Sequence, residues 1–107
     1  MNPAEWLALG GLIRAMMAAD GKLSLKEHRL VAVLAGRLGP ELWTCLAEAE
    51  LRLKDEPALW RQAAKVVDPE HRAVIRGILE EVALSDGLAP AEQALLHRLD
   101  ELWEGEP

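Results

Sequence analysis

Four acidic residues occupy matching positions in two similar segments of this sequence. One segment covers residues 18–27 and contains Asp20 and Glu27, and the other covers residues 84–92 and contains Asp86 and Glu92. Carboxylate oxygens are the ligands that hard divalent cations such as calcium prefer. If the two segments meet in the folded chain, the four carboxylates would repel one another unless a cation or protons neutralise them. We therefore predict a metal site with the ligands Asp20, Glu27, Asp86 and Glu92.

The first segment can be aligned with the second half of an EF-hand loop. Asp20 would then be the fifth residue of the loop and Glu27 its final ligand. The first half does not fit, because Met16 and Ala18 offer no side-chain oxygen. The second segment is one residue shorter between Asp86 and its glutamate. We reject an EF-hand and keep a weak or shared cation site as a hypothesis.

Helix capping explains several of the same residues without any ligand. Gly21 and Gly87 are suited to ending a helix, because glycine readily adopts the left-handed conformation found there. Ser24 and Glu27 have the spacing of a capping box, in which each side chain accepts a backbone N–H of the other residue. Asp20 and Asp86 are less well explained by local geometry, so they support the ligand hypothesis most strongly.

Helical patterns cover almost the whole chain and must position these residues. We expect six helices, with these bounds: Pro3 to about Ala19, Ser24 to Leu38, about Pro40 to Lys54, Asp55 or Glu56 to Val67, Pro69 to near Gly87, and near Pro90 to Trp103. The sequence therefore predicts an all-α compact bundle of about six helices, built from two helix-loop-helix halves. Residues 1–104 are expected to form one domain, and residues 105–107 a frayed tail.

Apolar residues at helical spacing predict the core. The expected inward positions are Trp6, Leu9, Ile13, Met16, Met17, Leu30, Val31, Leu34, Leu38, Leu42, Cys45, Leu46, Ala49, Leu53, Leu59, Trp60, Ala63, Val67, Val74, Ile75, Ile78, Leu79, Val82, Leu95, Leu96, Leu99 and Trp103. Gly10 and Gly11 lie inside the first helix, where we expect another helix to approach closely. Trp43 and Trp60 lie near stripe edges, and would mark a contact surface if both were exposed and close together.

Composition excludes several classes of function. The 107 residues carry a net charge of −6 and no dense Lys/Arg cluster, which argues against nucleic-acid binding. No apolar run is long enough for direct membrane insertion, and the N-terminus does not read as a secretory signal. The single cysteine, Cys45, fits a reducing compartment, so we expect a cytoplasmic protein.

Motifs for catalysis are missing from the sequence. His28, His71 and His97 are too far apart for a zinc motif and are expected at the surface or partly packed. There is no nucleophile elbow and no phosphate-binding glycine loop. We expect a protein that is not an enzyme. An enzyme that uses paired carboxylates and a metal is a third hypothesis, after the two functions given below.

The two Asp-Gly segments, at this separation in a helical chain of this length, resemble those of the TerB-like family of tellurite-resistance proteins. The resemblance covers nearly the whole chain. It implies a compact helical bundle without established catalytic activity. It also implies a role in tellurite resistance or a related stress response, through protein contacts near the cytoplasmic membrane surface. Metal binding would fall to Asp20, Glu27, Asp86 and Glu92.

The motifs and the resemblance together lead to two hypotheses for the function. The preferred one is a non-enzymatic cytoplasmic protein-interaction module with weak cation binding at the Asp-Gly loops, and a basic or membrane-associated protein as its partner. The alternative is a divalent-metal-binding sensor or store that acts in tellurite or stress response. The oligomeric state is left open, because an apolar helix face can pack inward or against another chain.

Overall fold

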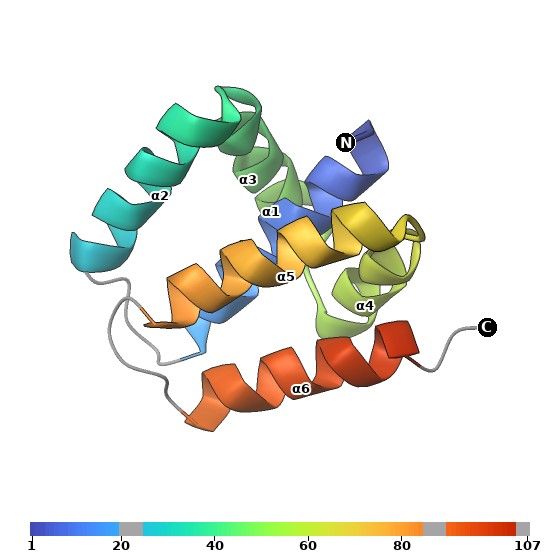
Figure 1. Cartoon of the computed structure of the whole chain (residues 1–107). Coiled ribbons are helices and arrows are strands. Elements are labelled where there is room, and N and C mark those ends of the chain that lie inside the picture. Colours follow the sequence, from blue (N-terminus) through green and yellow to red (C-terminus); the bar gives the residue numbers. More distant parts are fainter. Residues whose placement is uncertain (20–24, 85–89, 105–107) are drawn as a thin grey trace.

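A computed structural model describes residues 1–19, 25–84 and 90–104, with residues 25–28 described as helical backbone only. These residues form six α-helices and no strand, which confirms the all-α prediction (Figure 1). The helices are α1 (Pro3–Ala18), α2 (Leu25–Leu38), α3 (Glu41–Arg52), α4 (Glu56–Ala64), α5 (Pro69–Leu84) and α6 (Pro90–Glu104). The predicted frayed tail, residues 105–107, lies outside the described residues.

Side-chain caps fix the starts of three helices. At α1, the Asn2 side chain accepts the Glu5 N–H and the Glu5 carboxylate accepts the Asn2 N–H, each at 2.8 Å. At α4, the Asp55 carboxylate accepts the Ala58 N–H at 2.8 Å. At α5, the Asp68 carboxylate accepts the backbone N–H groups of Glu70 and His71. These bonds satisfy donors that the first helical turn leaves without a partner.

Helix α1 runs through the centre of the fold. Its residues 7–13 are all buried, so it is enclosed on nearly every side rather than along one stripe. It packs most extensively against α3, and then against α4 and α5. Figure 1 shows α1 in blue, passing behind α5. Helix α2 packs on α3, while α6 packs on α5 and α4.

The two glycines of α1 allow the close packing that the sequence predicts. A Cβ atom at Gly10 would lie 2.7 Å from the carbonyl carbon of Cys45 in α3. One at Gly11 would lie 2.8 Å from a methyl group of Leu59 in α4. Real Cβ atoms do not approach other atoms so closely. At Gly10 the obstructing atoms belong to the α3 backbone, so only glycine fits there while α3 stays in place, whereas at Gly11 they are the ends of leucine side chains, which can shift.

Most of the predicted core is confirmed, with two corrections. Val67 was expected inside, but it is 69% exposed, while Val66 is fully buried. Helix α4 ends at Ala64, so helical periodicity no longer predicts which side chain points inward. Val74 was also expected inside, and it is 48% exposed because the buried stripe of α5 starts at Ile75. Among the described residues, no helix has both the length and the apolar run needed to cross a membrane.

Candidate functional site

The structure describes the side chain of one of the four predicted metal ligands. Glu92 lies in the first turn of α6 and is buried, with 4% of its surface exposed. Asp20 and Asp86 lie outside the described residues. Glu27 lies in the first turn of α2, but its side chain is also outside the description. The convergence of the four carboxylates therefore stays a prediction.

The described helix ends next to both Asp-Gly segments lie on one side of the molecule. Figure 1 shows the end of α1, the start of α2, the end of α5 and the start of α6 on the left of the view. Helices α1 and α5 also pack against each other. A shared site requires such an arrangement. Within the part of the chain that is described, no three Asp, Glu, His or Cys side chains are placed to hold a metal ion together.

A buried carboxylate that the sequence analysis did not single out joins α1 to α5. Glu5 is 4% exposed, and its Oε2 lies 2.7 Å from Nδ1 of His71. The hydrogen bond from the Asn2 N–H holds the pKa of Glu5 below its usual value, against the effect of burial, and His71 adds to the lowering. The spacing Asn2-x-x-Glu5, a capping-box pattern, was the available signal.

The geometry of this pair favours a structural role. The Glu5 carboxylate is occupied by the Asn2 N–H and by His71, and neither Glu5 nor His71 lines the two surface hollows considered below. The predicted surface or partly packed position fits His71, whose side chain is 34% exposed. It also fits His97, whose side chain is 75% exposed.

Cys45 has no signs of reactivity. Its side chain is 3% exposed, and Sγ donates to the Leu42 carbonyl oxygen at 3.1 Å. Burial raises the pKa of the Cys45 thiol to about 11. The thiolate, which is the reactive form, is therefore scarce at neutral pH. The predicted packing role of Cys45 agrees with this environment.

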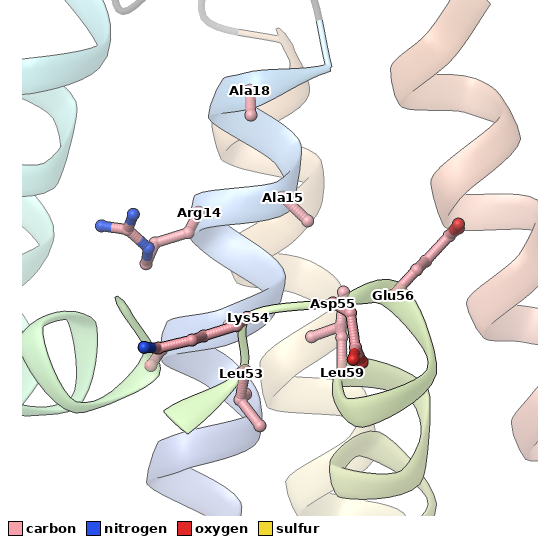
Figure 2. A pocket seen from close by; sticks show the side chains of 10 residues that line it. Arg14, Ala15, Ala18, Leu53, Lys54, Asp55, Glu56 and Leu59 are labelled. Atoms are coloured by element: carbon pink, nitrogen blue, oxygen red, sulfur yellow. The ribbon is translucent and has the colours of Figure 1, made fainter. Parts of the chain in front are cut away.

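Two surface hollows border the outer face of α1. One lies between α1 and the turn that joins α3 to α4, has a volume of about 300 Å³, and carries charged residues at its rim (Figure 2). The other has a volume of about 290 Å³ and a more apolar lining, drawn from α1, α2 and α3. The lining residues of this second hollow are Arg14, Met17, Val31, Trp43, Leu46, Ala47 and Glu50. We call it the Trp43 hollow.

The two tryptophans that the sequence places near stripe edges have different environments. Trp60 is buried at 8% exposure, its indole N–H donates to Glu56 at 3.3 Å, and the Arg98 guanidinium lies 4.9 Å from its ring centroid. Trp43 is 49% exposed. A joint Trp43–Trp60 surface is therefore ruled out, and Trp43 alone lies at a solvent-accessible apolar site.

Three carboxylates are exposed on α3, and one of them, Glu50, lines the Trp43 hollow together with Arg14. The other two, Glu41 and Glu48, line a separate hollow beside Pro3 and Trp6. Glu50 has a long 3.7 Å ion pair with Arg14, and Glu48 has one of 3.9 Å with Arg52. Such exposed pairs are weak, so the carboxylates can form ion pairs with other molecules.

Comparison with protein-family models, with curated proteins and with solved structures finds no match for this chain. The resemblance to TerB-like proteins therefore rests on the two Asp-Gly segments and on the helical pattern around them.

Proposed function

We propose that this protein is a non-enzymatic interaction module of TerB-like type that binds a basic protein through the Trp43 hollow. The observation that carries the proposal is the half-exposed indole of Trp43 at the edge of an apolar hollow. The cellular setting that we propose is the cytoplasm, in tellurite or stress response, and this part rests on the family resemblance.

An exposed indole next to an apolar hollow is typical of a binding hot spot. Tryptophan offers a large apolar surface with few rotatable bonds, so little conformational entropy is lost when a partner covers it. Met17, Val31 and Leu46 line the hollow beside it and are otherwise buried in the core. The floor is therefore held by core packing, and a partner can bind without a large rearrangement.

Charge complementarity favours a basic partner. The chain carries a net charge of −6, and Glu50 lines the Trp43 hollow, where its long, exposed ion pair with Arg14 is weak. A partner with Lys or Arg side chains around an apolar anchor would match both features. Screening by salt should weaken such a complex.

Site-specific photo-crosslinking in cells tests the proposal. A benzoylphenylalanine at position 43 should capture one dominant basic protein, and the same probe at Val74, which is equally exposed on α5, should not. With that partner purified, Trp43→Ala should weaken binding by about 30-fold or more, while Val74→Ala should not. Equal capture at both positions, or an acidic partner, would contradict the proposal.

A divalent-metal sensor or store is the second candidate function. The burial of Glu92 and the common side of the four helix ends support it. Calorimetric titration with calcium, magnesium, manganese and zinc tests it, together with a double variant, Asp20→Asn/Asp86→Asn. Binding heat and a rise in melting temperature should occur in the parent and in the exposed-site control Glu104→Gln, but not in the double variant. If no cation produces heat, this candidate is rejected.

A further inference from the structure

The charged hollow between α1 and the α3–α4 turn has an apolar floor. Three small residues of α1, Gly11, Ala15 and Ala18, lie on one face of the helix and leave a trough. Leu53 and Leu59 line its base, as Figure 2 shows. The volume of about 300 Å³ is at the lower end of the range for small-molecule sites.

Two cationic side chains extend from the same side of this hollow. Figure 2 shows Arg14 and Lys54 pointing to the left of the view. Lys54 forms no hydrogen bond or ion pair with any residue that the structure describes. Arg14 has the long ion pair with Glu50, in which both side chains are exposed. Both cations can therefore bind an anion with little loss of existing contacts.

The two carboxylates at the rim already have structural roles. Asp55 accepts the Ala58 N–H and caps α4, whose N-terminal dipole partly offsets its charge. Glu56 accepts the indole N–H of Trp60 and extends to the other side of the hollow (Figure 2). The hollow therefore has a cationic side, an apolar floor, and two rim carboxylates that each hold one oxygen in a hydrogen bond within the chain.

We infer that this hollow binds a small amphipathic anion, namely a carboxylate on a short unbranched hydrocarbon chain. The carboxylate would pair with Lys54 and Arg14, while the chain would cover Ala15, Leu53 and Leu59. A neutral alcohol of the same length would lack the ion pairs, and an amine would be repelled by the two cations. Arg14 lines both this hollow and the Trp43 hollow, whereas Trp43 lines only the second, so a variant at Trp43 tests the two sites separately.

Titration of the full chain with hexanoate tests the inference. Saturable binding of hexanoate is expected by calorimetry, with weaker binding of hexanol, hexylamine and acetate. Lys54→Met should weaken hexanoate binding about fivefold, the effect of one exposed ion pair. Lys65→Met, the matched lysine variant on an exposed position at the end of α4, should bind as the parent does.

Filling the hollow provides a test that leaves every charge in place. Ala15→Leu should abolish hexanoate binding, and Ala18→Leu, at an exposed position, is a second filling variant should the first fail to fold. Trp43→Ala should bind hexanoate as the parent does. Failure of the hexanoate site can therefore be distinguished from failure of the proposed partner site at Trp43.

Three results would overturn the inference. The first is that hexanoate shows no saturable binding up to about 5 mM. The second is that hexanol or hexylamine binds as tightly as hexanoate. The third is that Lys54→Met, or a filling variant that folds, binds hexanoate as the parent does.

Discussion

At the scale of single residues, Glu5 and Cys45 have environments that depend on packing between helices. Glu5 is a capping residue by local sequence, and packing brings it to His71, which is 66 positions away in the chain. Cys45 is an apolar stripe residue by local sequence, and its burial between helices raises the pKa of its thiol, although nearby backbone groups, that of Gly10 included, act to lower it. The lowered pKa of Glu5 and the raised pKa of Cys45 both have measurable consequences.

Glu5→Gln should lower stability by an amount that depends on pH. The pKa of Glu5 is below its usual 4.5 in the folded state, so the folded protein holds this proton less tightly than the unfolded chain does. The stabilisation is therefore present above pH 4.5 and is lost as the pH falls through the folded-state pKa. Urea unfolding should show Glu5→Gln less stable by about 1 kcal/mol at neutral pH, and a difference that does not shrink in acid would refute this account.

Cys45 should resist alkylation while the protein is folded. A pKa of about 11 against the usual 9.0 leaves far less thiolate at pH 8. Labelling by iodoacetamide should be at least about 100-fold slower in the native protein than in urea. Mass spectrometry of the labelled protein over time measures both rates. Similar rates in the two conditions would show that the thiol is accessible.

At the scale of helices, the contact between α1 and α3 depends on Gly10. Gly10 allows the α3 backbone at Cys45 to approach α1 directly. Gly36 and Gly77, in α2 and α5, differ in this respect, since a Cβ atom at either position would meet no atom within 4 Å. The same substitution should therefore have opposite effects at these positions.

Gly10→Ala should destabilise the protein, while Gly36→Ala should stabilise it. At Gly10 the added methyl group overlaps the α3 backbone, which costs about 1–3 kcal/mol. At Gly36 the alanine gains helix propensity without a clash, a gain of about 0.5–1 kcal/mol. Thermal unfolding monitored by circular dichroism measures both, and a stable Gly10→Ala variant would mean that α3 can move away.

At the scale of the whole molecule, polar contacts join α6 to the rest of the fold. The Arg76 guanidinium of α5 donates two hydrogen bonds to Asp100 of α6, at 2.8 and 3.0 Å. The hydrogen bonds to Asp100 raise the pKa of Arg76. The indole N–H of Trp103 donates to the Ala63 carbonyl oxygen in α4 at 3.0 Å. The C-terminal half of α6 is thereby held against both α4 and α5.

Arg76→Met should cost more stability than Arg37→Met. The Arg76–Asp100 pair is bidentate and partly buried, so we expect a loss of about 1–2 kcal/mol. Arg37 pairs with Glu81 through one bond between two exposed side chains, so its loss should stay within about 0.5 kcal/mol. Denaturant unfolding compares the two variants, and equal losses would show that the second hydrogen bond adds nothing.

The amino-acid sequence by itself determined the helices, most of their bounds and most of the core. These features follow from local rules, because helical periodicity, caps such as Asp68 and the glycine pair in α1 act within a few residues or one helix face. These rules do not apply beyond the end of a helix. For this reason Val67, which was expected inside, is exposed, and its neighbour Val66 is buried. The predicted metal ligands follow from the same local pattern. Glu92 is the one among them whose side chain the structure describes.

Only the tertiary structure decided which surfaces are available for binding. Trp43 and Trp60 have similar positions at stripe edges, yet α6 brings Arg98 over the ring of Trp60, while the residues that the structure describes leave Trp43 49% exposed. Likewise, the hollow beside Arg14 and Lys54 is formed by α1, α3 and α4 together. Burial depends on which helices pack together, and residues far apart in the chain set that packing.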